Sequence, residues 1–514
     1  MENMYQDLVN TVNGKETAIT FMQHKMSRTL LIKHIDNMAG FLHSIGIKNG
    51  DKVGIVAPNV PTAVIAFYAI NKLGAISNIF HPLVAPLDLI KKLKATDTRV
   101  VFMYDLFYKK YKKLLKEYNI TVIICSAKDY LDSFTKFIFS IGLDPIRGII
   151  KDEYTVADFR KEYTSKVSFN ENACLLHSSG TDREKTVILT NQDFIELRKK
   201  MLKVVGEENF AKETTLVSLP IFHCFGLGVG IHTSLCVGAD IVLMPTFNPK
   251  AMVRLVKQEK VTTLIVIPSM VKKFISYGFN KNFKTVKHIY CGGDKLNEQV
   301  RKKFNTELHE YKDINILEGY GLTELTGVCV VNTEKEYREG SIGKPIDGIE
   351  ALIIDENNNP KGLNVVGELA LSSNTMMKSY YDGTKNTFMY NGKEFLKTGD
   401  LAKQDEDGFL YFMGRQKETI RIGGTNVFPR DIEDLVAKFT GIKEVICLEK
   451  DINNKPYIYL YVQANEETEE LKEKIRNVIS ENMLKYCMPK EIIFINKWPL
   501  NKNGKIDKKA LLNM

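Results

Sequence analysis

The chain has 514 residues, of which 44% are hydrophobic and 26% charged, an ordinary globular balance with enough length for two or more domains. The formal net charge is +9, but the lysines are spread along the whole chain. Because no helix-turn-helix, zinc-finger or RNA-binding motif accompanies this charge, the sequence argues against a nucleic-acid partner.

The first part of the chain alternates helical and strand patterns. Apolar residues at helical spacing mark 31–47 ("LIKHIDNMAGFLHSIGI") and 62–75 ("TAVIAFYAINKLGA"), and short apolar strands are expected at 51–58, 100–105 and 121–126. The alternation continues through the segments 214–220, 239–245, 251–260, 262–269 and 286–293. Strands and helices in this order predict a mainly parallel sheet with helices on both faces.

One segment of the first part, 134–150 ("FTKFIFSIGLDPIRGII"), is unusually apolar. We expect a packed loop or interface there, and contact with a membrane surface is the alternative. No apolar run approaches the roughly 18 residues that a membrane span needs.

The texture changes after about residue 340, where short strands separated by turn residues predict a β-rich subdomain. Near residues 414–417 a new α+β pattern begins, with strands at 444–450, 456–464 and 491–499 and a helix whose inner face carries Leu471, Ile475 and Val478. We therefore expect an α/β fold. A large N-terminal domain (1–413) of mixed parallel sheets and helices includes the β-rich subdomain (340–413), and a small C-terminal domain (414–514) follows.

The cysteines indicate a reducing environment. They are Cys125, Cys174, Cys224, Cys236, Cys291, Cys329, Cys447 and Cys487. None forms a Cys-x-x-Cys pair and most lie in apolar stretches, so we interpret them as reduced core thiols. With no signal-peptide pattern in "MENMYQDLVN", the expected location is the cytoplasm.

The stretch 177–186, "HSSGTDREKT", looks like part of a phosphate-binding loop. A Walker A loop needs a second glycine directly before its lysine, and here that glycine is absent and the spacing is one residue short. Taken alone, the stretch favours a surface turn over a nucleotide site.

Downstream motifs change that interpretation. They are "YCGGDKL" (290–296), "EGYGLTE" (318–324), "EGSIGKPIDG" (339–348), "GELALS" (367–372), "KTGD" (397–400), "GFLYFMGRQKETIRIGGTNVFPRDIE" (408–433) and "LNKNGKIDKKAL" (500–511). In order and spacing they resemble the adenylate-forming superfamily, which holds acyl-CoA synthetases, peptide-synthetase adenylation domains and luciferases. The resemblance covers nearly the whole chain, from "GDKVGIVAPNVP" (50–61) to its end.

The resemblance implies that 178–187 is the family's phosphate loop in an altered form. The family pattern is S/T-S-G-T-T-G-x-P-K-G-V, and the matching residues that would bind ATP here are Ser178, Ser179, Gly180, Thr181 and Lys185. The Gly-x-Pro portion is lost, and the carboxylates of Asp182 and Glu184 would repel phosphate unless they point away. This change concerns the rate and the ATP affinity more than the type of reaction.

The resemblance also implies the catalytic residues. Lys505 matches the lysine that bridges the substrate carboxylate and the α-phosphate, where a fixed ammonium offsets shared negative charge. Thr323 matches a phosphate-contacting hydroxyl and Glu324 the Mg²⁺ ligand, because Mg²⁺ takes only one or two carboxylates beside phosphates. His223, in "LPIFHCFG" (219–226), matches the histidine at the acyl end of the site, and a satisfied core histidine is the alternative.

Further residues would hold the nucleotide. Asp400 would accept both ribose hydroxyls, since a carboxylate can accept two hydrogen bonds, and Arg415 would help to hold the ribose or phosphate end. The adenine slot would comprise Gly292, Gly293, Asp294, Glu318, Gly319 and Tyr320. In this slot "DKL" stands where the family commonly has "APL".

The small domain of this family is mobile. Lys417 matches the hinge about which that domain rotates between the two half-reactions. One orientation would present Lys505, and the other would bring Arg421, Gly423 and Gly424 to the tunnel through which the thiol enters.

These features predict a ligase that uses ATP, Mg²⁺ and CoA to activate a carboxylic acid as an acyl-adenylate and then to form a thioester. The segment "TTLVS" (214–218) lacks the aspartate with which amino-acid-activating domains hold an ammonium, which favours a fatty-acyl or aryl acid. The alternatives are a ligase that loads an acyl carrier protein and a non-catalytic relative that binds a nucleotide or acyl ligand. We expect a monomer or a homodimer.

Overall fold

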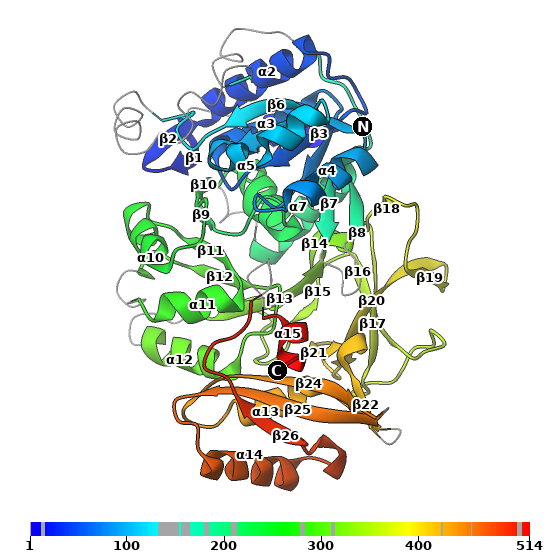
Figure 1. Ribbon diagram of the computed structural model, residues 1–514. Coiled ribbons are helices and arrows are strands. Elements are labelled where there is room, and N and C mark those ends of the chain that lie inside the picture. Colours follow the sequence, from blue (N-terminus) through cyan, green and yellow to red (C-terminus); the bar gives the residue numbers. More distant parts are fainter. Residues whose placement is uncertain are drawn as a thin grey trace.

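The computed structural model (Figure 1) describes residues 2–11, 16–131, 154–155, 165–178, 185–206, 213–277, 283–309, 314–422, 425–453, 455–500 and 506–514. It is a mixed α/β structure built on two large sheets, a smaller antiparallel sheet and a C-terminal group of strands and helices, which confirms the expected fold class. In the described part of the chain no helix is long and apolar enough to cross a membrane. The apolar segment 134–150 lies outside the described residues.

The first large sheet has the strand order β18-β8-β7-β4-β3-β5-β6. Its strands are β3 (Lys52–Val56), β4 (Ile76–Ile79), β5 (Thr98–Tyr104), β6 (Thr121–Cys125), β7 (Asn172–Ser178), β8 (Lys185–Thr190) and β18 (Ser379–Tyr380). From β7 to β6 all neighbours are parallel, while β8 and β18 are antiparallel additions. The predicted strands at 51–58, 100–105 and 121–126 are confirmed as β3, β5 and β6.

Helices cover this sheet. They are α2 (Arg28–Ser44), α3 (Pro61–Lys72), α4 (Pro86–Ala95) and α5 (Asp105–Glu117). Every residue of α3 is buried, since its sequence is apolar on nearly all sides and α2 packs against it. Ser27 caps α2 by accepting a hydrogen bond from the backbone N–H of Leu30. The helices expected at 31–47 and 62–75 are thereby confirmed as α2 and α3.

The second large sheet has the order β15-β14-β13-β12-β11-β9-β10-β1-β2. Its strands are β1 (Thr17–Phe21), β2 (His24–Ser27), β9 (Thr214–Val217), β10 (Asp240–Leu243), β11 (Thr263–Val266), β12 (His288–Cys291), β13 (Ile316–Leu322), β14 (Gly327–Val331) and β15 (Lys344–Pro345). The strands from β13 to β1 are parallel. Because parallel strands end at one edge, the carboxyl ends of β12 and β13 lie side by side.

The helices of this second half are α7 (Asn191–Val205), α9 (Ser234–Cys236), α10 (Pro249–Gln258), α11 (Pro268–Ile275), α12 (Glu298–His309) and the π-helix η1 (Phe225–Thr233). Figure 1 shows α10, α11 and α12 as a row beside β9, β11 and β12. The π-helix packs against α7, where Gly228 allows the approach: an added Cβ would lie 2.8 Å from Leu197. The N-terminal helix α1 (Met4–Thr11) contacts α3, α7 and α9.

The third sheet is antiparallel, with the order β16-β17-β20-β19 and β21 paired to β20. Its strands are β16 (Ile349–Ile354), β17 (Gly367–Ser373), β19 (Thr387–Tyr390), β20 (Lys393–Gln404) and β21 (Leu410–Arg415). These strands are the short strands that the sequence predicts after about residue 340.

The elements that follow form what we call the C-terminal unit, from β22 to α15. It comprises β22 (Ile420–Ile422), β23 (Thr425–Val427), α13 (Pro429–Val436), β24 (Ile442–Ile452), β25 (Lys455–Ala464), α14 (Glu469–Asn482), η5 (Lys485–Cys487), β26 (Glu491–Phe494) and α15 (Lys508–Leu512). Its larger hydrophobic cluster runs from Ile420 to Ile492 and is separate from the main cluster of the molecule, which spans Met4 to Leu410. On α14 Ile475 is fully buried and Leu471 and Val478 pack against the same cluster, as predicted.

Candidate active site

The predicted adenine-slot residues and Thr323 lie on neighbouring elements at one end of the second sheet. Strand β12 leads directly into Gly292 and Gly293, and Cys291 of β12 pairs with Glu318 of β13. The chain then passes from β13 into the short helix η3 (Thr323–Leu325) and returns as β14. The adenine-slot motif and the "GLTE" motif are therefore held by adjacent strands.

The β13–β14 turn is tight because two glycines touch across it. A Cβ added to Gly321 would lie 1.5 Å from the carbonyl oxygen of Gly327, so only glycine fits at position 321. Thr326 closes the turn in the left-handed conformation, with φ at 59°, and its hydroxyl donates to the carbonyl oxygen of Thr375 at 2.8 Å. The backbone thus fixes Tyr320 before the turn and Thr323 within it.

Asp400 on β20 is the most deeply buried charged group of this region. The Tyr320 hydroxyl donates to its Oδ2 at 2.6 Å, and Arg415 of the paired strand β21 places Nε 2.8 Å from its Oδ1. That ion pair lacks the alignment of a hydrogen bond, and among the described residues Oδ1 accepts no hydrogen bond. Burial raises the pKa of Asp400 to about 6, against the opposing charge of Arg415. A buried carboxylate with one open acceptor suits a ligand hydroxyl.

The carboxylate of Glu318 has two partners within the protein. It forms an ion pair with Arg301 of α12 and accepts a hydrogen bond from the backbone N–H of Leu296 at 3.1 Å. Burial is the main cause that raises its pKa, although the charge of Arg301 opposes the shift. These contacts hold the loop after β12 against β13. Arg301 was not among the predicted residues, because nothing in the helical pattern around it indicates a buried partner.

The adenine-slot glycines lie against backbone and an aromatic ring. A Cβ added to Gly292 would lie 3.3 Å from both the carbonyl oxygen of Gly319 and the ring of Phe225 on η1. Gly293 has φ at +84°, which favours glycine. Asp294, the next residue, is exposed and forms an ion pair of 3.0 Å with Arg430 of the C-terminal unit.

Glu324 lies on η3 with its carboxylate near a tyrosine that the sequence analysis missed. The hydroxyl of Tyr380 donates to Glu324 Oε1 at 3.0 Å. The ring of the same tyrosine lies 4.1 Å from Lys185 Nζ, measured to the ring centre. Lys185 begins β8 and pairs with Ser178 at the end of β7, so it stands at the base of the predicted phosphate loop. Ser179, Gly180 and Thr181 lie outside the described residues.

His177 anchors the same base from inside the sheet. Asn78 Oδ1 lies 2.9 Å from its Nε2, the hydroxyl of Thr186 lies 3.1 Å from its Nδ1, and Phe80 stacks on the ring at 4.7 Å. Burial lowers the pKa of His177 to about 3, so the ring is neutral at physiological pH. Since Asn78 Oδ1 can only accept, Nε2 carries the ring proton.

The remaining predicted residues are more dispersed. His223 is exposed in the turn before η1, and its backbone N–H donates to Pro220 at 3.0 Å. Lys417 is exposed on η4 (Gln416–Glu418), directly after β21. Arg421 on β22 forms an exposed ion pair with Glu356 at 3.0 Å. The other predicted residues of this region lie outside the described part of the chain, namely Gly423, Gly424 and Lys505.

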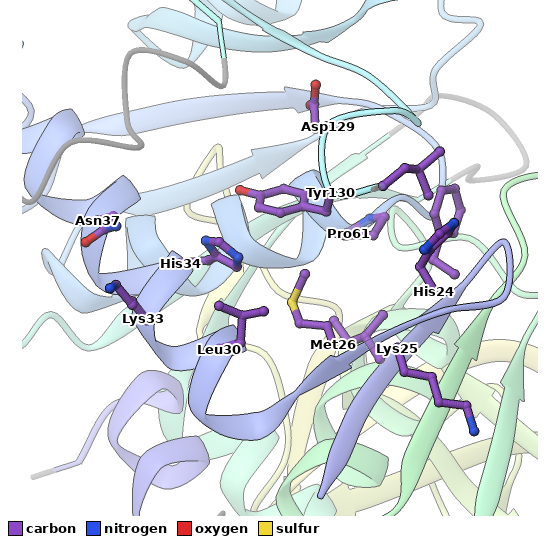
Figure 2. A pocket seen from close by; sticks show the side chains of 13 residues that line it. His24, Lys25, Met26, Leu30, Lys33, His34, Asn37, Pro61, Asp129 and Tyr130 are labelled. Atoms are coloured by element: carbon purple, nitrogen blue, oxygen red, sulfur yellow. The ribbon is translucent and has the colours of Figure 1, made fainter. Parts of the chain in front are cut away.

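A cavity of about 420 Å³ lies elsewhere, between the β1–β2 hairpin, the start of α2 and residues 129–131 (Figure 2). Basic side chains and apolar side chains share its lining, with His34 edge-on to Tyr130 at 4.7 Å. Asp129 on its border accepts hydrogen bonds from the Thr62 hydroxyl and the backbone N–H of Ser126, each at 2.8 Å. None of the predicted site residues lines this cavity.

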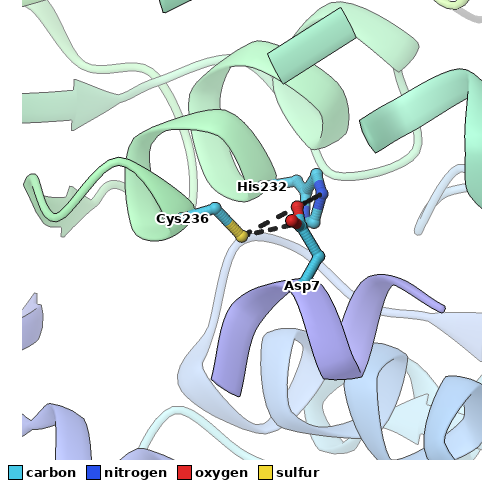
Figure 3. Close-up of side chains that lie close together, drawn as sticks. All are labelled: Asp7, His232 and Cys236. Atoms are coloured by element: carbon cyan, nitrogen blue, oxygen red, sulfur yellow. Dashed lines mark hydrogen bonds and ion pairs between the residues drawn. The ribbon is translucent and has the colours of Figure 1, made fainter. Parts of the chain in front are cut away.

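A second polar cluster ties α1 to the core (Figure 3). The ligand atoms of Asp7, His232 and Cys236 lie within 4.8 Å of one another, and all three residues are buried. Arg198 donates to both oxygens of Asp7, at 2.8 and 2.7 Å, and His232 Nε2 lies 3.2 Å from Asp7 Oδ2. Burial works to raise the pKa of Asp7, but the contacts of His232 and Arg198 bring it below its usual value. The guanidinium already balances the carboxylate, so the cluster is a structural network that opposes a bound cation.

Comparisons with known proteins agree on a family. The model of the AMP-binding enzyme family matches residues 9–381. The chain is 27% identical to 4-coumarate--CoA ligase-like 8 of Arabidopsis thaliana, over 98% of this chain and 90% of the relative. It is 26% identical to a long-chain-fatty-acid--CoA ligase of Bacillus subtilis, over 97% and 91%.

Solved structures support the fold. ATP-bound MatB from Rhodopseudomonas palustris superposes with a TM-score of 0.85 at 19% identity, covering 99% of this chain and 98% of that one. A benzoate CoA ligase from Burkholderia xenovorans also gives 0.85, at 17% identity and coverage of 99% and 100%.

Proposed function

This chain belongs to the family of AMP-binding enzymes, the adenylate-forming ligases, and on that premise we propose that it joins a carboxylic acid to a thiol through an acyl-adenylate. The observation that carries the proposal is Asp400, a buried carboxylate with one oxygen bound by Tyr320 and the other without a hydrogen bond in the described structure. A ribose diol would complete this pair of acceptors. Tyr320 and Gly292 beside it would border the adenine.

In the first half-reaction a carboxylate oxygen of the acid attacks the α-phosphorus of ATP. The bond from that phosphorus to the bridging oxygen breaks, and pyrophosphate leaves. The protein contributes mainly position and charge to such a transfer. We assign the ribose and α-phosphate end to Asp400 and Arg415, the outer phosphates to Lys185 and Thr323, and the bridge between carboxylate and α-phosphate to Lys505. The last assignment rests on the motif "NGKID" (503–507).

Glu324 is the residue that would hold Mg²⁺, with Oε1 oriented by Tyr380. A single carboxylate fits this ion, because Mg²⁺ completes its coordination with phosphate oxygens and water. When bound, the ion would neutralise charge on the phosphates.

In the second half-reaction a thiol sulfur attacks the acyl carbon, the bond from that carbon to the phosphate oxygen breaks, and AMP leaves while the thiol proton is lost. We propose CoA as the thiol, with Arg421, Gly423 and Gly424 beside its path and Lys417 at a hinge of the C-terminal unit. We also propose that residues 1–413 and 414–514 are the two domains that this motion requires. Their separate hydrophobic clusters support this division.

The acid that best fits the sequence is an uncharged fatty-acyl or aryl acid. The segment "TTLVS" (214–218) forms β9 and the residue after it, without an aspartate to hold a substrate ammonium. One relative is named as a long-chain-fatty-acid--CoA ligase and another as a 4-coumarate--CoA ligase-like protein. An acyl carrier protein as acceptor and a non-catalytic binding role remain the alternative proposals, the latter because of the altered phosphate loop.

Pyrophosphate exchange tests the first half-reaction. Purified protein is incubated with ATP, Mg²⁺, labelled pyrophosphate and one acid at a time, from acetate to palmitate, with benzoate and several amino acids. We expect acid-dependent exchange with a subset of the apolar acids and its loss in Lys505→Ala. A folded protein that exchanges with no acid would contradict the proposal. Adding CoA or a phosphopantetheinylated carrier protein then identifies the acceptor.

A further inference from the structure

Residues 375–381 form a bracket between the phosphate-loop strand and the predicted metal ligand. The backbone N–H of Met377 donates to the carbonyl oxygen of Glu324 at 2.8 Å. The N–H groups of Lys378 and Tyr381 donate to the carbonyl oxygens of Ile188 and Thr186 on β8, at 3.1 and 2.8 Å. One short segment is thus bonded to both elements, although it lies more than 50 residues from either.

Tyr380 of this bracket stands between two opposite charges. Its side chain is 7% exposed, its ring faces the ammonium of Lys185 and its hydroxyl donates to Glu324 Oε1. Burial and the neighbouring Glu324 raise the pKa of Tyr380, so the hydroxyl stays protonated and remains a donor. Within the described part of the chain neither Lys185 nor Glu324 forms an ion pair.

This arrangement keeps both charges available. A direct ion pair between Lys185 and Glu324 would neutralise the ammonium needed for phosphate and the carboxylate needed for a cation. The aromatic face attracts the ammonium without neutralising it, and the hydroxyl occupies only one carboxylate oxygen. The arrangement also fixes a lysine whose loop has lost the family's Gly-x-Pro portion.

We propose that Tyr380 is a positioning residue that holds Lys185 for the polyphosphate and orients Glu324 for the divalent cation. The proposal rests on the proposed function, because it assigns partners at the same ATP site. The two contacts of Tyr380 can be removed separately, because the hydroxyl binds Glu324 whereas the ring contacts Lys185.

Two variants separate these contacts. Tyr380→Phe removes the hydroxyl and keeps the ring, whereas Tyr380→Leu removes both. Calorimetric titration of ATP, with Mg²⁺ and with EDTA, measures binding without any acid. We expect Tyr380→Phe to raise the Kd of ATP about fivefold with Mg²⁺ and less than twofold with EDTA. Tyr380→Leu should raise both values about fivefold or more.

Exchange kinetics give a second measurement with an active acid. For Tyr380→Phe the Mg²⁺ concentration at half-maximal rate and the KM for ATP should rise about fivefold, with kcat changing less than threefold. Tyr381→Phe is the matched control, since Tyr381 is the next residue and is 37% exposed. It should leave all of these values within twofold of the wild type.

An unchanged Mg²⁺ dependence in Tyr380→Phe would overturn the proposal, as would equal effects in Tyr381→Phe. Thermal melting of each variant checks that it is folded. Tyr380→Phe is the decisive variant, because removing only the hydroxyl preserves the packing of the ring. A wild-type protein that binds no ATP would instead contradict the proposed function.

Discussion

Asp400 shows how burial can prepare a single residue for a ligand. Its carboxylate is 1% exposed, lies beside Arg415 and Tyr320, and has a pKa raised to about 6 by burial. Its Oδ1 forms the ion pair with Arg415 but accepts no hydrogen bond from the described protein. A ligand hydroxyl would relieve part of the cost of burying this charge.

Nucleoside binding should therefore depend on pH. The raised pKa means that Asp400 gains a proton as the pH falls through about 6, and the protonated group loses acceptor capacity. We expect the Kd of adenosine, which has no phosphate to titrate, to rise roughly tenfold between pH 7 and pH 5. Calorimetry across this range checks the value.

Asp400→Asn should bind adenosine more weakly at pH 7 and without this pH dependence. Asp88→Asn is the control, because Asp88 is an exposed carboxylate on α4. An adenosine Kd that stays constant from pH 5 to pH 7 in the wild type would exclude Asp400 as the acceptor.

Sequence motifs predicted candidate site residues, such as Glu318, Glu324 and Lys185, but not the residues that contact them. Tyr380 and Arg301 were missed, because a tyrosine in a two-residue strand and an arginine in a helix have no local signal. Their importance arises from partners 56 and 17 residues away, which only the folded chain brings near.

At the scale of elements, periodicity and turn residues predicted three strands of the first sheet (β3, β5 and β6), the helices α2 and α3, and the β-rich part after residue 340. They did not predict that β1 joins the second sheet beside β10, more than 200 residues away. The π-helix η1 was also not predicted, because "FGLGVGIHT" (225–233) has no polar face to reveal its period. Both features depend on packing that the local sequence does not encode.

Helix α13 carries an element-scale prediction. Glu433 on this helix accepts a hydrogen bond of 2.8 Å from the backbone N–H of Cys447 on β24, and burial raises its pKa from 4.5 to about 7. Because this pKa is higher in the folded than in the unfolded protein, Glu433 stabilises the folded state most when the pH is below its unfolded pKa. That stabilisation is lost as the pH rises through the folded pKa of about 7. The free energy of unfolding of Glu433→Gln, relative to that of the wild type, should therefore rise by about 2 kcal/mol from pH 5.5 to pH 8.

Urea unfolding of the wild type and of Glu433→Gln at the two pH values measures this difference. Trp498 is the single tryptophan of the chain and its indole N–H donates to Gln463 on β25 at 3.0 Å, so its fluorescence reports on the C-terminal unit. A stability difference between the two proteins that is independent of pH would contradict the prediction.

At the scale of the whole molecule, crossed ion pairs join the C-terminal unit to the second sheet. Asp294 pairs with Arg430 at 3.0 Å, and Lys295 pairs with Asp434 at 2.5 Å. Asp294 and Lys295 stand where the family has Ala-Pro, and Arg430 and Asp434 lie on α13. The departure from the family pattern therefore stabilises the observed orientation of the unit. Because the groups are partly exposed, the pairs together contribute about 1 kcal/mol.

Reversing one charge should shift the orientation of the unit. Lys295→Glu places like charges opposite Asp434 and should lower the population of the observed orientation roughly fivefold, while Lys295→Glu combined with Asp434→Lys restores it. All eight native cysteines are buried, so dyes can be placed selectively on Leu87→Cys and Glu469→Cys for energy-transfer measurements. High salt should also lower the population of the observed orientation, because it screens the ion pairs. Identical distance distributions in all three proteins would contradict the prediction.

The close contact of Gly321 with Gly327 has a consequence for how this gene can change. Even the methyl group of alanine would overlap the Gly327 carbonyl oxygen, and no choice of rotamer relieves an overlap at Cβ. A missense mutation in this codon would therefore separate β13 from β14 and displace Tyr320 and Thr323 together. Synonymous changes of this glycine codon leave the turn intact, whereas every missense change at codon 321 adds a Cβ and should be removed by selection.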